Sequence, residues 1–143
     1  MDNSRNLGKI AEILVDYFKN GSLVVSAYIF GSFGTKEQTP LSDLDIAVLF
    51  TGEISLMEEL RHTGEISSLL GLEKVDFINL NKAPVHLQHE VLLKGTKIFD
   101  GKPELTQDFV ERVLEIYHDY QGIINKYRAD FHESLIEEYL NGR

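Results

Sequence analysis

Two apolar segments separated by a polar loop constrain the fold of this chain more than any other feature of its sequence. Residues 23–30 (LVVSAYIF) are rich in β-branched and aromatic side chains and run directly into the pair Gly31-Ser32. Residues 33–42 are mostly polar and contain glycine and proline, and residues 43–50 (DLDIAVLF) return to the earlier composition. Such apolar segments pack well on a pleated, buried surface, so both predict strands and the residues between them predict a loop.

Carboxylates recur at every second position at the start of the later strand. Because side chains alternate along a strand, we expect Asp43 and Asp45 to point to one face and Leu44 to the other. Asp76 lies in a further predicted strand, residues 74–80 (KVDFINL), and is a candidate third carboxylate for the same site. Hard divalent cations prefer oxygen ligands, and two such cations about 3.5–4 Å apart need two or three convergent carboxylates. The pattern therefore indicates metal-assisted phosphoryl or nucleotidyl transfer.

The Gly31-Ser32 pair supplies the other half of such a site. A glycine lets the backbone approach an oxyanion closely, and backbone N–H groups together with the Ser32 hydroxyl can donate hydrogen bonds to phosphate oxygens. An Asp-x-Asp pattern alone is more often the solvated face of a strand. The glycine-serine turn ten residues earlier and the third aspartate favour the functional interpretation.

The remaining segments predict helices that separate or follow the strands. Apolar residues recur at helical spacing in three stretches, a short strand is predicted near residues 96–99, and a helical stripe continues beyond Pro103. The helical stretches are residues 10–18, 54–70 and 84–94. This order predicts an α+β domain over residues 1–102 with a small mixed β-sheet flanked by helices. Residues 103–143 are expected to form a C-terminal helical extension packed on the same domain, as one helix or two, since Gly122 lies inside the stripe.

The composition excludes several classes of site and partner. The 143 residues include no cysteine, which excludes a disulfide framework, a cysteine-ligated zinc site and a thiol nucleophile. The net charge of −9 argues against broad binding to nucleic-acid backbones, which depends on Lys and Arg. No segment approaches the length of a membrane span, and the first residues lack the pattern of a secretory signal, so we expect a cytoplasmic protein without membrane contact.

The central motif resembles that of a known enzyme superfamily. The segment GSFGTKEQTPLSDLDIAVLF, residues 31–50, is similar to the signature of the DNA-polymerase-β-like nucleotidyltransferases. That signature is a Gly-Ser turn, a loop and an Asp-x-Asp strand, with a third aspartate on a later strand. The segment VDFINLNKAPVHLQHEVLLKGTKIFDG, residues 75–101, resembles the minimal nucleotidyltransferases (MNT), specifically the MntA-type antitoxins of HEPN/MNT toxin–antitoxin systems. The resemblance covers roughly residues 7–101 and implies the palm-like nucleotidyltransferase fold of polymerase β.

The resemblance also implies an activity and a partner. MntA-type antitoxins bind a HEPN-domain ribonuclease toxin (HepT-like) in a hetero-oligomer and transfer AMP from ATP to one of its tyrosines, which neutralises the toxin. Carried over by position, Asp43 and Asp45 would hold Mg²⁺, with two ions expected. Asp76 would complete the metal site and help to activate the tyrosine hydroxyl.

Nucleotide binding is implied at four positions around the loop. Gly31, Ser32, Lys36 and Ser42 would contact the nucleotide, with Gly31 and Ser32 at the triphosphate. This chain departs from many relatives directly after the Gly-Ser pair, where Phe33 stands in place of Arg or Lys. Lys36 is the candidate to compensate at the γ-phosphate.

Two other functions remain open from the sequence. The same fold could neutralise a toxin by binding alone, or it could transfer a nucleotide to a hydroxyl of a small molecule. His86 and His89, three residues apart on a predicted helix, suggest either a metal site or, preferably, a solvated or partner-facing position. The aromatic stripe of the helical extension indicates core where it faces the domain and a partner-binding surface at its far end; it comprises Tyr117, Tyr120, Tyr127, Phe131 and Tyr139.

Overall fold

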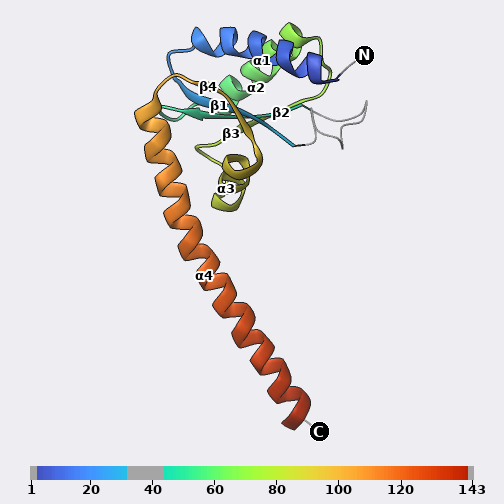
Figure 1. Cartoon of the computed structure of the whole chain (residues 1–143), viewed down its shortest axis with the longest axis vertical. Coiled ribbons are helices and arrows are strands. Elements are labelled where there is room, and N and C mark those ends of the chain that lie inside the picture. Colours follow the sequence, from blue (N-terminus) through green and yellow to red (C-terminus); the bar gives the residue numbers. More distant parts are fainter. Residues whose placement is uncertain (1–2, 32–43, 142–143) are drawn as a thin grey trace.

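The structure is a computed structural model that describes residues 3–31 and 44–141. Four helices and four strands follow one another along the described residues (Figure 1). In chain order they are α1 (Asn3–Lys19), β1 (Val24–Phe30), β2 (Leu44–Phe50), α2 (Leu56–Leu70), β3 (Val75–Asn79), α3 (Val85–Lys94), β4 (Thr96–Asp100) and α4 (Pro103–Asn141). The predicted elements are all present. Helix α1 begins seven residues before the predicted apolar stretch of residues 10–18, and the other ends within the described ranges differ from the prediction by at most two residues.

The four strands form one mixed sheet in the order β3-β2-β1-β4. Strand β1 is antiparallel to both of its neighbours, and β2 is parallel to β3. Helices α1 and α2 cover one face of the sheet, and α3 with the first turns of α4 covers the other (Figure 1). The architecture confirms the predicted α+β fold with a mixed sheet flanked by helices.

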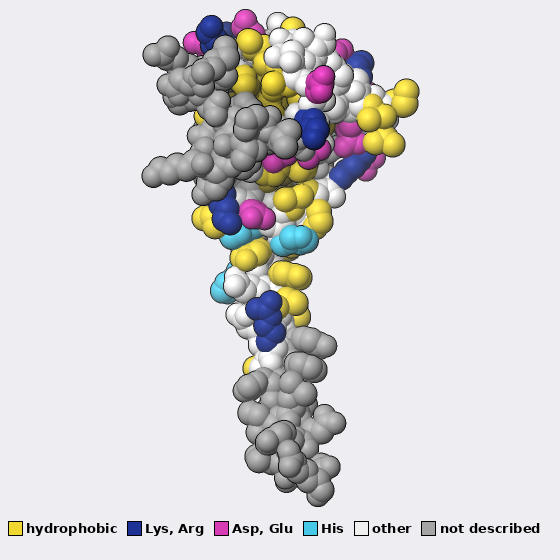
Figure 2. Space-filling view, turned by 90° about the vertical axis from the view of Figure 1, so that its right-hand side faces the viewer, with side chains coloured by type: hydrophobic (Ala, Val, Ile, Leu, Met, Phe, Trp, Pro, Cys, Tyr) yellow, Lys and Arg dark blue, Asp and Glu magenta, His cyan; other side chains and the backbone are white. Residues whose placement is uncertain are grey.

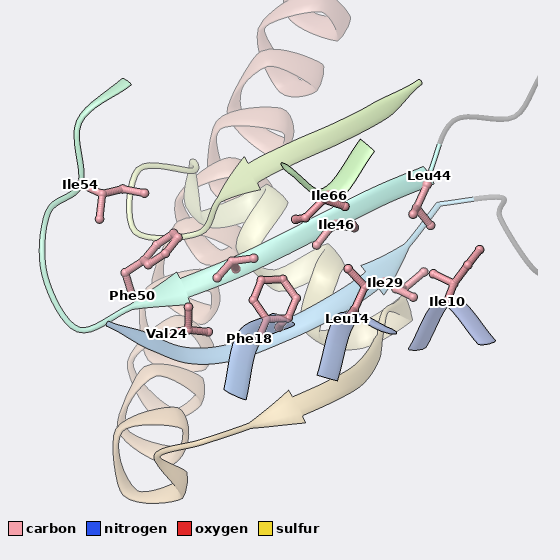
Figure 3. Packing of buried hydrophobic residues seen from close by; sticks show 12 residues of the cluster. Ile10, Leu14, Phe18, Val24, Ile29, Leu44, Ile46, Phe50, Ile54 and Ile66 are labelled. Atoms are coloured by element: carbon pink, nitrogen blue, oxygen red, sulfur yellow. The ribbon is translucent and has the colours of Figure 1, made fainter. Parts of the chain in front are cut away.

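The larger core lies between the sheet and the pair α1 and α2. Helix α1 contributes apolar side chains at helical spacing, and alternate residues of β1 and β2 meet them from the sheet (Figure 3). These buried residues are Ile10, Leu14, Phe18, Val24, Ala27, Ile29, Leu44, Ile46, Val48, Phe50, Ile54 and Ile66. The burial of one set of alternate residues in β2 fixes which way the other set, including Asp45, must point.

The smaller core lies on the opposite face. Ala47 and Leu49 of β2 pack there against α3 and the start of α4, whose Phe109 and Val113 are 3% and 1% exposed. Asp45 precedes these two residues at the same alternation, so its side chain belongs to this face of the sheet.

A polar cluster joins α1 to α2 above the larger core. The Tyr17 hydroxyl lies 2.6 Å from Nδ1 of His62 and 2.6 Å from Oε2 of Glu65. Burial and then the hydrogen bond to Glu65 raise the pKa of Tyr17 well above its ordinary value, and the same hydrogen bond lowers the pKa of Glu65. Burial lowers the pKa of His62, whose ring stacks on Phe77 of β3 at 5.6 Å between centroids. The cluster therefore holds the two helices together with neutral rings and one carboxylate.

Replacing Tyr17 with phenylalanine is expected to lower the free energy of unfolding by about 1 kcal/mol. A hydrogen bond to a charged group is worth about 1.5–3 kcal/mol, and the 43% exposure of the Glu65 side chain places this one below that range. Urea unfolding measures the change. Tyr120→Phe, at an exposed position on α4, is the control. Equal free energies of unfolding for the two variants would show that the cluster does not stabilise the packing of α1 on α2.

Helix α4 is one continuous helix of 39 residues. Gly122 does not divide it, because a single glycine weakens a helix by only about 1 kcal/mol relative to alanine. Its first turns pack on α3 and β1, and the rest projects away from the sheet (Figure 1). None of the helices within the described ranges is long and apolar enough to span a membrane.

Candidate active site

The candidate site lies at the end of the sheet where β1 stops and β2 starts. Because these strands are antiparallel neighbours, the chain leaves and re-enters the sheet at the same end, and Phe30 pairs with Asp45 in the register. Strand β3 runs parallel to β2, so it begins at this end as well, with Asp76 paired directly with Asp45. Gly31, Asp45 and Asp76, which are distant in sequence, therefore meet at one edge.

The two aspartates point to the same face of the sheet. Paired residues on adjacent strands share a face and lie on strands about 4.8 Å apart. Leu44 and Ile46 are fully buried on the opposite face, as the alternation predicts. Asp45 is half-buried and Asp76 is exposed. The two carboxylates are thus close to each other and reachable from solvent on the Asp76 side.

A backbone hydrogen bond fixes the starts of β2 and β3 relative to each other. The Leu44 N–H donates to the Lys74 carbonyl oxygen at 3.2 Å, one residue before Asp45 and two residues before Asp76. Like charges on adjacent strands repel each other. The free-energy cost of this repulsion is small only where solvent or an opposite charge lies beside the two groups. The two carboxylates are therefore candidate ligands for a cation.

Gly31 lies against the Asp45 carboxylate. Its φ of 85° is in the left-handed region that side chains other than glycine rarely adopt. A Cβ at this position would overlap Oδ2 of Asp45 and lie 3.2 Å from its Cγ. Two independent constraints therefore require glycine here, and both come from the turn that ends β1 beside the carboxylates.

Four of the predicted site residues lie outside the described part of the chain: Ser32, Lys36, Ser42 and Asp43. Their roles remain predictions from the sequence. Within residues 3–31 and 44–141 there is no group of three or more His, Cys, Asp or Glu side chains arranged to hold a metal. Asp43, two residues before Asp45 in the sequence, stays the predicted third carboxylate.

One histidine of the predicted pair on α3 packs against another helix, and the other is exposed. The His89 ring stacks on the Tyr117 ring of α4, with centroids 3.6 Å apart and planes 4° from parallel. His86, three residues earlier, is exposed. His89 therefore contributes to the α3–α4 contact within the chain, a packing role that the sequence did not predict.

Comparison with known proteins identifies the family to which this chain belongs. Residues 12–104 match the family described as polymerase beta nucleotidyltransferase, and this match covers the sheet and the site at its edge. The chain belongs to the polymerase beta nucleotidyltransferase family.

Two relatives in sequence carry a more specific name. The chain is 38% identical over 80 residues to the "Putative protein adenylyltransferase MJ1217" of Methanocaldococcus jannaschii, which is 54% of this chain and 81% of that protein. It is 26% identical over 117 residues to the protein adenylyltransferase MntA of Shewanella oneidensis, which is 82% of this chain and 81% of that protein.

Solved structures share the fold. A chain in the complex of a tri-AMPylated Shewanella oneidensis HEPN toxin with an MNT antitoxin superposes with a TM-score of 0.66 at 23% identity, covering 92% of this chain and 99% of that one. A toxin–antitoxin structure with AMP-PNP gives 0.67 at 21% identity, covering 92% and 99%. A minimal nucleotidyltransferase gives 0.54 at 26% identity, covering 67% of this chain and 95% of that one.

Proposed function

We propose that this chain is an antitoxin-type adenylyltransferase, which transfers AMP from ATP to a tyrosine of a cognate HEPN-type ribonuclease toxin and so neutralises it. The observation that carries the proposal is the pairing of Asp45 with Asp76 beside the Gly31 turn. The similarity to protein adenylyltransferases, and to an MNT antitoxin that was solved with an AMPylated toxin, supports this acceptor over others.

The residues at the site suit Mg²⁺, with two ions proposed. Asp45 and Asp76 provide hard carboxylate oxygens on one face of adjacent strands, and Asp43 follows the same alternation in the sequence. Bound Mg²⁺ would neutralise charge on the triphosphate and on the leaving pyrophosphate. Because the chain as a whole is acidic, with a net charge of −9, bound metal is proposed as the main source of this positive charge.

The chain's own groups have separate roles in the transfer. The hydroxyl oxygen of the tyrosine forms a bond to the α-phosphorus, the bond from that phosphorus to the β-phosphate oxygen breaks, and pyrophosphate leaves. Asp76, the more exposed of the two described carboxylates, is proposed to help remove the hydroxyl proton. The Gly31 turn, with Ser32, Lys36 and Ser42 of the following segment, is proposed to hold the triphosphate.

Position-specific labelling of ATP tests the type of transfer. The chain and its cognate HEPN protein are incubated with Mg²⁺ and ATP that carries the radioactive phosphorus at either the α or the γ position. We expect the α label on the HEPN protein, no γ label, and no transfer in the presence of EDTA. Label from the γ position would identify a kinase and contradict the proposal.

The same experiment separates the two alternatives. A stable complex with no label on either protein would favour neutralisation by binding alone. An α label that appears only on an added small-molecule hydroxyl would favour a small-molecule acceptor. Neither result is expected, because the paired carboxylates suit nucleotide transfer and the similarity to protein adenylyltransferases supports a protein acceptor.

A further inference from the structure

A cavity of about 750 Å³ lies between α1 and α2, on the face of the sheet opposite the two carboxylates. Val24 and Phe50, which line it, belong to the larger core and stand at the start of β1 and the end of β2. Asp45 precedes Phe50 by five residues along β2, which is about 16 Å. Figure 3 shows Val24 and Phe50 at one end of the sheet and Leu44 at the other. The cavity is therefore separate from the candidate active site.

The walls of this cavity combine exposed apolar side chains with a few polar groups. Ile13 of α1, Leu23 before β1 and Leu69 of α2 line it and are 38%, 51% and 55% exposed. Cavities of about 300–1,000 Å³ with apolar walls and a small number of convergent polar groups are typical binding sites of small molecules. The size and the walls therefore suit a small molecule with an apolar body.

Many of the polar groups come from one face of α2. Glu58, His62 and Glu65 line the cavity and follow one another at spacings of four and three residues, which puts them on the same side of the helix. Arg61 also lines the cavity, and its guanidinium forms an ion pair with Glu65 at 3.0 Å. The positive charge of Arg61 is therefore already matched by a carboxylate, and Glu58 is left without a cation.

The Glu58 carboxylate is half-buried and has no hydrogen-bond or ion-pair partner within residues 3–31 and 44–141. Glu58 follows Ser55 at the spacing of a capping box, in which the carboxylate would accept the Ser55 N–H. The structure contains only the other half of that box, in which the Glu58 N–H donates to Ser55 Oγ at 3.2 Å. On the face shown in Figure 2, acidic and basic side chains of the body lie next to one another. Because a partly desolvated charge is costly without an opposite charge, the cavity favours a ligand that brings a positive one.

His62 adds a hydrogen-bond acceptor to the same wall. The Tyr17 hydroxyl has one proton, which it donates to the Glu65 carboxylate, a group that can only accept. The Nδ1–H of His62 therefore donates to the Tyr17 oxygen, over 2.6 Å. Because burial lowers the pKa of His62, its ring is neutral and Nε2 is an acceptor. A carboxylate and an acceptor nitrogen one turn apart on α2 match the N–H donors of an ammonium group.

We propose that this cavity binds a small organic cation, a protonated amine on an aromatic body. The ammonium group would lie beside Glu58 and His62. The rings of Tyr17 and Phe50 lie 5.8 Å and 5.7 Å from that of His62, and aromatic walls favour both an aromatic body and a nearby cation. An anion would have to displace Glu65 from Arg61 and would be repelled by Glu58. The inference does not rest on the proposed function, because the catalytic edge takes no part in it.

Two probes of the same shape and opposite charge test the proposal. Tryptamine carries an ammonium group and indole-3-propionate a carboxylate, on the same ring and the same linker. Each probe is titrated at pH 7 into the full-length chain labelled with nitrogen-15, and the backbone amide signals are followed by NMR. We expect a dissociation constant of about 1 mM or below for tryptamine and binding of the propionate that is at least about tenfold weaker. The largest changes are expected at the amides of Ile13, Gly21 and Leu69, which line the cavity.

A matched pair of variants at the start of α2 locates the charge that is recognised. Glu58→Gln and Glu59→Gln each remove one negative charge from the same turn. Glu58 lines the cavity, whereas the Glu59 carboxylate points to Lys82, with 3.3 Å between Oε2 and Nζ. Glutamine can still complete a capping box, so the helix should keep its start, which circular dichroism checks. We expect Glu58→Gln to weaken tryptamine binding by at least about fivefold and Glu59→Gln by less than about twofold.

Four results would overturn the inference. They are equal or tighter binding of the propionate, no binding of tryptamine at up to about 10 mM, signal changes centred on Asp45 and Asp76, and equal effects of the two variants. The comparison of the two probes uses the wild-type chain and does not depend on the folding of any variant. Because no AMP transfer is measured, a failure here leaves the proposed function intact, and a failure of the transfer experiments leaves this inference intact.

Discussion

Replacing Asp45 with asparagine is expected to lower the rate of AMP transfer by at least about 10³-fold. Asparagine keeps the size of the side chain but removes the negative charge of Asp45, which lies beside Asp76 in the register of β2 and β3. Charge stabilisation by bound metal is worth several kcal/mol in the transition state, and each 1.36 kcal/mol is a factor of about ten in rate. The rate is measured from label transfer at saturating ATP.

The fold should survive this substitution, which makes the result interpretable. Asp45 is half-buried at the end of its strand, and the substitution removes a repulsion between adjacent carboxylates. Asp16→Asn, at an exposed position of α1, is the matched control and should keep its full rate. An Asp45→Asn variant as active as this control would show that the paired carboxylates are not the catalytic site.

Replacing Gly31 with alanine is the second large effect that we expect. The Cβ would overlap the Asp45 carboxylate oxygen, and the residue would have to hold a φ of 85°. Backbone strain of this kind costs about 1–3 kcal/mol in the free energy of unfolding. Relief of the overlap displaces either the carboxylate or the turn, so we expect transfer to fall by at least about 100-fold, since small misplacements of catalytic groups cost about that much.

Gly64→Ala is the matched control for this variant. Gly64 lies inside α2, and a Cβ there would meet nothing within 4 Å. Alanine should leave the rate unchanged and raise the free energy of unfolding by up to about 1 kcal/mol, because glycine is the poorer helix former. Urea unfolding and label transfer on both variants measure the two effects. If Gly31→Ala had the same transfer rate and stability as Gly64→Ala, the close approach of the Gly31 backbone to the Asp45 carboxylate would have no role in stability or transfer.

The orientation of the two candidate carboxylates, Asp45 and Asp76, was predictable because it depends on local alternation. Leu44 and Ile46 are apolar and must face the core, so Asp45 must face away from them. Asp76 alternates in the same way with its apolar neighbours. That Asp76 pairs directly with Asp45 was not determined by the sequence, because the register of two parallel strands depends on the packing of the α2 crossover between them.

Contacts between segments that are distant in the chain could not be predicted from the sequence. The Tyr17 hydroxyl meets His62 and Glu65 across 45 and 48 positions, and no local pattern marks those three residues as neighbours. The stack of His89 on Tyr117 is similar: helical spacing places each ring on a helix, and only the packing of α3 on α4 brings them together. The aromatic stripe in the extension predicted core where it faces the domain, and Tyr117 does contact α3; the sequence did not show the point at which the domain stops covering α4.

Intact-mass spectrometry of the cognate HEPN protein tests the central claim most directly. The protein is incubated with this chain, Mg²⁺ and ATP, and in parallel with the Asp45→Asn variant. The account predicts a mass increase in whole units of AMP with the wild-type chain and no increase with the variant. An unchanged mass of the HEPN protein in a stable complex with the wild-type chain would contradict transfer and leave neutralisation by binding as the function.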